Sequence, residues 1–140
     1  MNAPSPCDRS KMGPPLVQRV LVVEDNDDSA ALLVELLERR GIEVRAATSA
    51  ADAMDALQQS LPDVVVLDIG LPDADGYAVA RAIRKLFGSA IRLIALTGFS
   101  STAELEDAMA AGFNSFLTKP YLFEELEVLL TRDSGTIRLP

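Results

Sequence analysis

The chain has 140 residues, of which 49% are hydrophobic and 24% are charged, a balance that suits one packed domain and argues against global disorder. Its formal net charge of −8 disfavours binding to nucleic acid or anionic membranes, and the absence of histidine means that any phosphohistidine must belong to another protein. With one cysteine and no segment resembling a signal peptide or a membrane span, we expect a cytoplasmic protein.

Residues 1–18 include four prolines and lack helical or strand periodicity, which predicts a flexible, Pro-rich leader. From residue 19 the pattern changes to short apolar runs, each followed by a segment with apolar residues at helical spacing. The runs predict strands at 19–24, 42–47, 64–67, 91–96 and 114–117. The segments that follow them predict helices at about 27–40, 49–59, 76–87, 101–111 and 121–131. Residues 132–140 are expected to form a short C-terminal tail.

Polar residues and glycines mark the expected helix ends. Candidate N-caps precede the first, second and fourth helices: Asn26 or Asp27, Ser49 and Ser101. Ser101 and Glu104 have the spacing of a capping box, and Gly112 closes the same helix. In the third helix Val79, Ile83 and Leu86 form one apolar stripe.

Five strand–helix pairs in about 110 residues predict an α/β fold with a parallel sheet, because parallel strands need crossover connections. We expect a doubly wound, five-stranded (βα)5 sheet with helices on both faces and the flavodoxin-like strand order 2-1-3-4-5. The folded domain should span 19–131.

Chemically active side chains follow four of the five predicted strands. Glu24 and Asp25 follow the first strand, Asp68 the third and Thr97 the fourth, and Lys119 follows the fifth. In a doubly wound sheet ligands bind at the carboxyl ends of the strands, beside the switch in strand order. Three carboxylates, a hydroxyl and an ammonium group are therefore expected to face one crevice.

Clustered carboxylates repel one another unless they bind protons or share a cation. Oxygen ligands suit Mg²⁺, with Mn²⁺ as a similar ion, and Lys119 adds a compensating charge. A carboxylate beside a metal and a lysine can attack phosphorus, while the Thr97 hydroxyl can bond a phosphoryl oxygen.

Four stretches of the chain resemble the receiver domain of two-component response regulators. Their residues are most similar to those of receivers in hybrid sensor kinases. The stretches are LVVEDN (21–26), VVVLDIGLPDADG (64–76), IALTG (94–98) and FLTKP (116–120). The resemblance implies that Asp68 is the phosphoacceptor, that Thr97 is the switch hydroxyl and Phe116 the switch aromatic, and that Lys119 binds the phosphate. The bond before Pro120 is expected to be cis.

The resemblance also implies a Mg²⁺ site. Asp25 and Asp68 would be direct ligands, together with the backbone carbonyl of Gly70, and Glu24 would act mainly through metal-bound water. The family positions of Gly70 and Phe99 tune dephosphorylation, and neither residue offers a side chain that positions water, so slow self-dephosphorylation is expected.

The resemblance further implies partners. The phosphodonor would be a histidine kinase or a histidine phosphotransfer protein, and a downstream protein would bind the face formed by 101–111, 114–117 and 121–131. Only 21 residues follow Lys119, so we expect no output domain on this chain, which would be a single-domain regulator or a receiver cut from a larger protein. Catalysis would be limited to self-phosphorylation and self-dephosphorylation.

Two alternatives stay open. One is a Mg²⁺-dependent small-molecule phosphatase or phosphotransferase with an aspartyl nucleophile, which the short loops disfavour because none could form a substrate lid. The other is a flavodoxin-like cofactor binder, disfavoured because Glu24 and Asp25 occupy the place of a phosphate-cradling loop. The DADG sequence at 73–76 is interpreted as a turn leading into the third helix.

Overall fold

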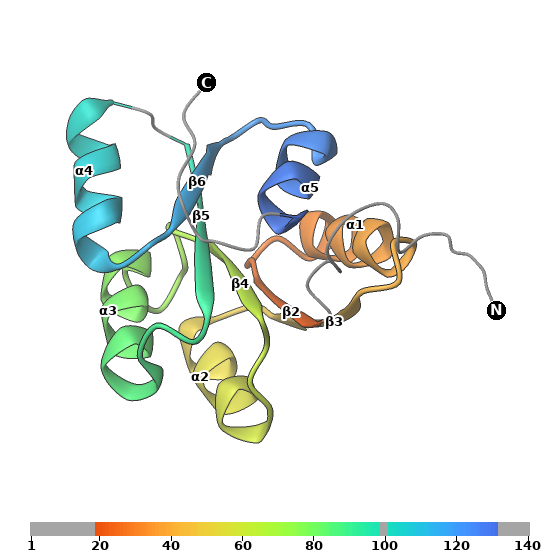
Figure 1. The fold of residues 1–140 in the computed structure, drawn as a ribbon, viewed down its shortest axis with the longest axis horizontal. Helices are drawn as coiled ribbons and strands as arrows, with labels where there is room; N and C mark the ends of the chain where they lie inside the picture. Colours follow the sequence, from red (N-terminus) through yellow and green to blue (C-terminus); the bar gives the residue numbers. More distant parts are fainter. Residues whose placement is uncertain (1–18, 99–100, 132–140) are drawn as a thin grey trace, which may run out of the picture.

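The computed structural model describes residues 19–98 and 101–131 (Figure 1). The leader at 1–18, the tail at 132–140 and Phe99 lie outside the described residues. Strands and helices alternate along the chain in the order β2 (Arg19–Val23), α1 (Asp27–Glu38), β3 (Glu43–Ala47), α2 (Ala50–Gln59), β4 (Val64–Asp68), α3 (Gly76–Phe87), β5 (Arg92–Thr97), α4 (Thr102–Ala111), β6 (Ser115–Thr118) and α5 (Phe123–Thr131).

The five strands form one parallel sheet in the order β3-β2-β4-β5-β6, which confirms the predicted order 2-1-3-4-5. The order reverses at β2, because β3 pairs with one of its edges and β4 with the other. All five residues of the central strand β4 are buried, as expected for a strand covered on both faces. At the edge, β3 exposes the charged residues Glu43 and Arg45.

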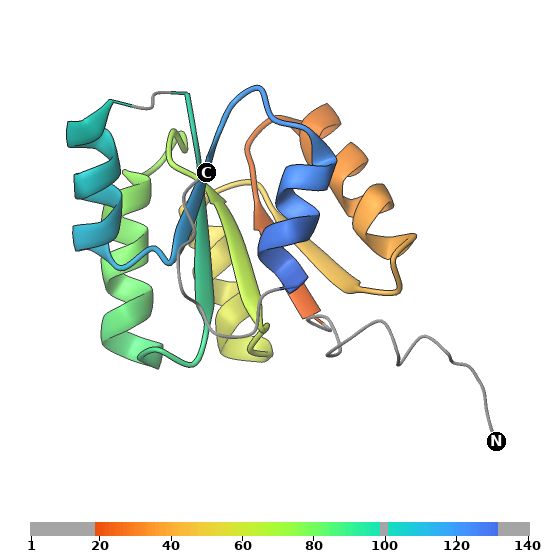
Figure 2. The ribbon, with the colours of Figure 1, turned by 45° about the horizontal axis from the view of Figure 1, so that its top comes forward.

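Helices cover both faces of the sheet (Figure 2). Leucines of α1 and α5 pack with Val20 and Val22 on one face, whereas α2, α3 and α4 pack with Leu21 and Val23 on the other. Successive side chains of a strand point to opposite faces, so the continuous apolar run of β2 supplies both cores. The doubly wound α/β architecture is therefore the predicted one.

Most of the expected caps are present. The side chains of Asn26, Ser49 and Ser101 each accept a hydrogen bond from the backbone three residues on. Gly112 ends α4 with a φ of 110°, in the left-handed region. The N–H of Glu104 donates to Ser101 as in a capping box, and the carboxylate of Glu104 also accepts a hydrogen bond from the Tyr77 hydroxyl at 2.7 Å.

Two apolar residues depart from the sequence expectation. Leu86 belongs to the predicted apolar stripe of α3, but it is 60% exposed near the C-terminal end of that helix. The last helix begins at Phe123 rather than at Tyr121, which leaves Leu122 67% exposed in the preceding loop. Among the described residues, no helix combines the length and the apolar character needed to cross a bilayer.

Candidate functional site

Side chains from four neighbouring strand ends meet at the carboxyl edge of the sheet. Asp68 and Thr97 are the last residues of β4 and β5, while Glu24 follows β2 directly and Lys119 follows β6 directly. The register brings these ends level, since Asp68 pairs with Leu96, one residue before Thr97, and Thr97 pairs with Thr118, one residue before Lys119. The pairing of parallel strands thus assembles residues that are up to 95 positions apart in the sequence.

Lys119 bridges two buried carboxylates. Its Nζ lies 2.9 Å from Asp68 Oδ2 and 3.2 Å from Glu24 Oε1. Glu24 is 4% exposed and Asp68 is 8% exposed, so both carboxylates are held away from bulk water. Buried charges are tolerated when they are paired and hydrogen-bonded, and Lys119 supplies the pairing for both.

A backbone N–H group binds the second oxygen of each carboxylate. The N–H of Gly70 donates to Asp68 Oδ1 at 2.9 Å, and the N–H of Asn26 donates to Glu24 Oε2 at 3.3 Å. Each carboxylate therefore has one oxygen on the Lys119 ammonium and one on the main chain. This arrangement fixes the orientation of both groups before any ligand arrives.

The electrostatic environments of the two carboxylates differ. Burial raises the pKa of Glu24, and the neighbouring Asp68 carboxylate raises it further. Burial also acts to raise the pKa of Asp68, but hydrogen bonds from Lys119 and from the Gly70 N–H outweigh it, so the pKa of Asp68 lies below its usual value. The two carboxylates oppose the effect of burial on Lys119 and raise its pKa. At neutral pH Asp68 is therefore ionised and Lys119 is charged.

The acidic cluster has the composition of a divalent-cation site. Glu24, Asp25 and Asp68 each offer a carboxylate oxygen, and these oxygens lie within 4.8 Å of one another. Asp25 is exposed, whereas the other two residues are buried. A set of oxygen ligands with one side open to water suits Mg²⁺ or Mn²⁺, which keep several water ligands. The donor set therefore fits the cation that the sequence predicts.

Thr97 and Phe116 lie on the same face of the sheet. Thr97, which is 6% exposed, follows Ala95 by two residues and so shares its face. Phe116 pairs with Ala95 in register and packs against the core beneath α2, α3 and α4.

Two residues near the site were not predicted. Tyr121 follows the cis peptide bond between Lys119 and Pro120, and burial raises the pKa of its hydroxyl, which also experiences the charges of Lys119, Glu24 and Asp68. Asp73, in the loop after Asp68, accepts hydrogen bonds from the N-terminus of α2. The cis bond confirms the expectation for Pro120. The place of Tyr121 directly after this bond is the sequence feature that could have pointed to it.

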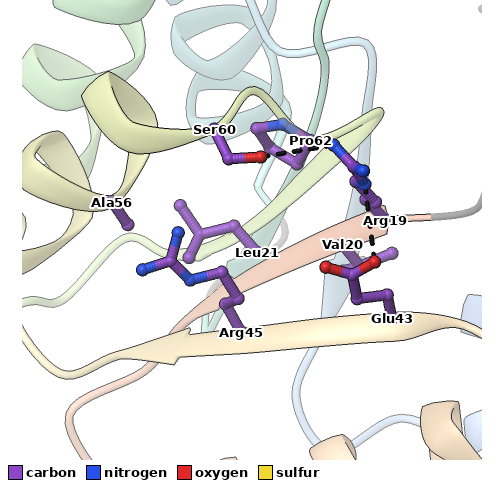
Figure 3. A pocket seen from close by; sticks show the side chains of 8 residues that line it. All are labelled: Arg19, Val20, Leu21, Glu43, Arg45, Ala56, Ser60 and Pro62. Atoms are coloured by element: carbon purple, nitrogen blue, oxygen red, sulfur yellow. Dashed lines mark hydrogen bonds and ion pairs between the residues drawn. The ribbon is translucent and has the colours of Figure 1, made fainter.

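A small pocket lies elsewhere, where β2 begins and α2 ends (Figure 3). The charged groups that line it are already satisfied by neighbours: Arg19 contacts Glu43 at 3.5 Å and donates to Ser60 at 3.3 Å, and Arg45 donates to Gln59 at 3.0 Å. None of the predicted site residues lines this pocket. The cluster at the carboxyl ends of the strands is the better candidate site, because three carboxylates and an ammonium group converge there.

The profile of the response regulator receiver domain matches residues 20–131. The chain belongs to this family. An uncharacterized 14.6 kDa protein of Leptolyngbya boryana is 36% identical over 102 residues, which cover 72% of this chain and 78% of that protein.

Two longer relatives match this receiver domain over part of their length. The uncharacterized transcriptional regulatory protein YrkP of Bacillus subtilis is 39% identical over 111 residues, or 79% of this chain and 47% of that protein. Sensor protein GacS of Pseudomonas syringae pv. syringae is 33% identical over 134 residues, or 91% of this chain and 15% of that protein. The chain thus spans less than half the length of either relative.

Solved structures agree with the fold. The receiver domain of the Francisella response regulator 1452 gives a TM-score of 0.76 at 26% identity, covering 81% of this chain and 93% of that one. A response regulator protein from Burkholderia pseudomallei was solved with a phosphorylated aspartic acid, a calcium ion and citrate. It gives a TM-score of 0.76 at 26% identity, covering 84% of this chain and 68% of that one.

Proposed function

We propose that this receiver domain is a phosphorylation-controlled signalling module in which Asp68 accepts a phosphoryl group from a phosphohistidine of a partner protein. The observation that carries the proposal is the environment of Asp68, a buried carboxylate whose pKa is lowered and which contacts Lys119 within an acidic cluster. An ionised carboxylate at the carboxyl end of a strand can act as a nucleophile and needs no general base.

In the transfer, a carboxylate oxygen of Asp68 attacks the phosphorus of the donor. A P–O bond forms, the P–N bond breaks, and the donor imidazole leaves with the electron pair and takes up a proton from water. Lys119 stays protonated, since its pKa is raised, and its Nζ can pass from Asp68 Oδ2 to an oxygen of the new phosphoryl group. The reaction exchanges one charge-assisted contact of Lys119 for another.

We infer that Mg²⁺, or Mn²⁺ in its place, is held by Asp25, Asp68 and the carbonyl of Gly70, with Glu24 acting through metal-bound water. Bound there, the cation would neutralise charge on the transferring group. The Burkholderia pseudomallei protein was solved with both a calcium ion and a phosphorylated aspartic acid, which supports a divalent cation as part of the proposal.

The response to phosphorylation is proposed to run through Thr97 and Phe116. The Thr97 hydroxyl would bond a phosphoryl oxygen, and Phe116, which shares its face of the sheet, would move into the space vacated. Phe116 lacks a hydroxyl, so packing alone would hold it in the new position. The change would reach a downstream protein at the surface of α4, β6 and α5. The donor would be a histidine kinase or a histidine phosphotransfer protein.

Slow loss of the phosphoryl group is part of the proposal. A Cβ atom at Gly70 would lie 3.8 Å from Asp68 Oδ1, so a longer side chain there would reach the phosphoryl group, but glycine offers none. We expect the phosphorylated protein to persist for minutes or longer in a discontinuous assay of remaining label. A half-life of seconds would contradict this part of the proposal.

Labelling tests the proposal directly. The full chain is incubated with Mg²⁺ and radiolabelled acetyl phosphate, and separately with phosphorylated histidine kinases and phosphotransfer proteins. We expect hydroxylamine-sensitive label on the parent and on Asp55→Asn, whose side chain lies exposed on α2, and none on Asp68→Asn. Equal labelling of the parent and Asp68→Asn would refute the proposal. Multiple turnover of small phosphorylated metabolites would favour the phosphatase instead.

A further inference from the structure

The loop that follows Asp68 is closed at its base. Gly70 and Asp75 form an isolated antiparallel bridge, and the N–H of Gly76 donates to the carbonyl of Ile69 at 3.0 Å. Gly76 permits this close approach, because a Cβ atom there would lie 2.5 Å from the Cα of Ile69. The chain therefore leaves β4 and enters α3 through a turn whose two ends are in contact.

The same loop is tied to a second element through Asp73. Its Oδ1 accepts the N–H of Ala50 at 2.8 Å, and its Oδ2 accepts the N–H of Ala51 at 3.1 Å. These N–H groups belong to the first turn of α2 and have no partner inside the helix. Ser49 caps the N–H of Asp52 in the same turn, so Asp73 supplies the two bonds that the cap leaves open.

Asp73 is a firm attachment for two reasons. The backbone hydrogen bonds lower the pKa of its carboxyl group, so it binds the positive end of the α2 dipole as an anion. The helix to which it binds is anchored in turn, since Ala53 and Leu57 are buried in the core. The loop is thereby held against a rigid part of the fold.

The segment held in this way contains Gly70. Its N–H group donates to Asp68 Oδ1 at 2.9 Å, and its carbonyl is a proposed ligand of the cation. Nothing else between Asp68 and the turn into α3 links the loop to α2 by a hydrogen bond among the contacts of the described residues. Gly70 and Asp73 therefore belong to one loop, which the Gly70–Asp75 bridge closes at its base and Asp73 ties to α2.

We propose that Asp73 is a positioning residue for the cation site: its two bonds to the first turn of α2 hold the loop so that Gly70 stays beside Asp68. The proposal rests on the function proposed for Asp68. A loop that is already in place loses little conformational freedom when the cation binds, whereas a released loop must be ordered at that moment. Releasing the loop therefore weakens cation binding without removing a ligand.

Two variants of the full chain test the proposal. Asp73→Ala removes both acceptors, and Asp73→Asn keeps one amide oxygen and serves as the gentler change. Asp55→Ala is the matched control, because Asp55 is an exposed aspartate of α2 itself. Mg²⁺ affinity is measured by calorimetric titration at a temperature where circular dichroism shows every variant folded, and labelling by acetyl phosphate is followed at low and at saturating Mg²⁺.

We expect Mg²⁺ affinity to fall by about tenfold in Asp73→Ala, the low end of the effect of residues that orient metal ligands. The Mg²⁺ affinity of Asp73→Asn should lie between those of Asp73→Ala and the parent. At low Mg²⁺ the labelling rate should decrease by the same factor, and at saturating Mg²⁺ it should return to the parent rate. A merely structural role would lower the melting temperature and leave the Mg²⁺ affinity of the folded protein unchanged.

The outcomes separate the two proposals. If the parent binds Mg²⁺ and is labelled on Asp68, but Asp73→Ala and Asp73→Asn bind Mg²⁺ as tightly as Asp55→Ala, the positioning role of Asp73 is overturned and the proposed function stands. If the parent itself neither binds Mg²⁺ nor accepts label, both proposals fail together. Labelling that stays low in Asp73→Ala at saturating Mg²⁺ would also contradict an action through the cation.

Discussion

The ammonium nitrogen of Lys119 lies 2.9 Å from Asp68 Oδ2, although β6, which Lys119 follows, is separated from β4 by the intervening strand β5. The same nitrogen contacts Glu24, so one positive charge serves two buried carboxylates. With Asp25 beside them, three carboxyl groups share one ammonium group. The pKa shifts of the two carboxyl groups are opposite. Burial and the Asp68 carboxylate raise the pKa of Glu24, whereas hydrogen bonds from Lys119 and the Gly70 N–H outweigh burial and lower the pKa of Asp68.

Lys119→Met should destabilise the metal-free protein, because it leaves Glu24 and Asp68 without their cation. Removing one partner of a fully buried pair costs about 3–5 kcal/mol, and partial exposure of Lys119 reduces the expected loss to about 1–3 kcal/mol. Mg²⁺ should restore much of this stability and bind more tightly than in the parent. Urea unfolding at pH 7 with EDTA and with Mg²⁺ measures both effects.

Lys85→Met is the control for this change, because Lys85 is an exposed lysine on α3. It should alter neither the free energy of unfolding nor the response to Mg²⁺ by more than about 0.5 kcal/mol. Equal unfolding free energies for Lys119→Met and the parent in EDTA would contradict the bridging role of Lys119.

Glu24→Gln should have the opposite effect on stability. Burial and the Asp68 carboxylate raise the pKa of Glu24, so folding makes its charged form costlier than it is in the unfolded chain. A neutral amide removes that cost and should stabilise the metal-free protein by about 0.5–1 kcal/mol, a common gain when a functional site is relaxed. Mg²⁺ affinity should decrease at the same time.

Thermal melts with and without Mg²⁺ check this trade-off, with the exposed α4 variant Glu106→Gln as the control. The expected pattern is a higher melting temperature in EDTA and a smaller increase on adding Mg²⁺. A lower melting temperature in EDTA would show that the interaction of Glu24 with Lys119 outweighs the cost of its burial.

The site residues can be predicted from the sequence because one rule of topology places the carboxyl ends of parallel strands side by side. The contacts that support the site are harder to predict, because they join segments whose distance in space the sequence does not show. Glu24, Asp68, Thr97 and Lys119 each follow an apolar run, and parallel pairing brings the ends of such runs together. The bonds of Asp73 join residues 22 and 23 positions apart through the placement of α2. No local periodicity indicates such a contact. The sequence of residues 73–76 therefore predicts a turn but not the bonds of Asp73 to α2.

The predictions for Leu86 and Leu122 were wrong because both relied on the apolar period of a helix alone. Leu86 fits the helical period of the α3 stripe, but its side chain is exposed, whereas the next residue, Phe87, packs against the core from the same turn. Leu122 was assigned to the last helix because the apolar period continues through it. The carboxylate of Glu125 instead accepts the N–H of Leu122 at 2.9 Å, and the helix begins at Phe123, two residues later than predicted.

Tyr77→Phe should loosen the contact between α3 and α4. The Tyr77 hydroxyl donates to Glu104 at 2.7 Å, and burial together with that carboxylate raises the pKa of Tyr77 to about 12. A phenol whose pKa is raised on folding contributes stability that is complete below its unfolded pKa of 10 and is lost as pH rises toward 12. The parent should therefore lose stability between pH 10 and 12 more steeply than Tyr77→Phe.

At neutral pH the same variant should lose about 1 kcal/mol, the net value of one hydrogen bond. Unfolding by urea at pH 7, 9 and 11 gives the comparison, and Glu104→Gln provides a second measurement from the other side of the pair. Parallel pH profiles for the parent and Tyr77→Phe would contradict the assignment of the alkaline loss to Tyr77.

Arg84→Met should be among the most destabilising changes outside the site. The Arg84 guanidinium donates to the carbonyls of Gly88 and Ile91 and, across the fold, to the Gly112 carbonyl and the Asn114 side chain. It thereby joins the end of α3 to the end of α4 and to the starts of β5 and β6. Carbonyls at helix ends lack partners within the helix, so methionine would leave several polar groups unsatisfied, at a cost of about 2–4 kcal/mol.

Arg84→Lys should recover only part of this loss, because an ammonium group cannot reproduce the planar fork that reaches three segments at once. Arg81→Met, at an exposed position one turn earlier in α3, is the matched control and should change stability by less than about 0.5 kcal/mol. Urea unfolding of the four proteins in EDTA gives the ranking. A loss in Arg84→Met no larger than in Arg81→Met would mean that water replaces the guanidinium at little cost, and the junction between α3 and α4 would then depend on the Tyr77 and Phe113 rings, which meet edge to face at 6.4 Å.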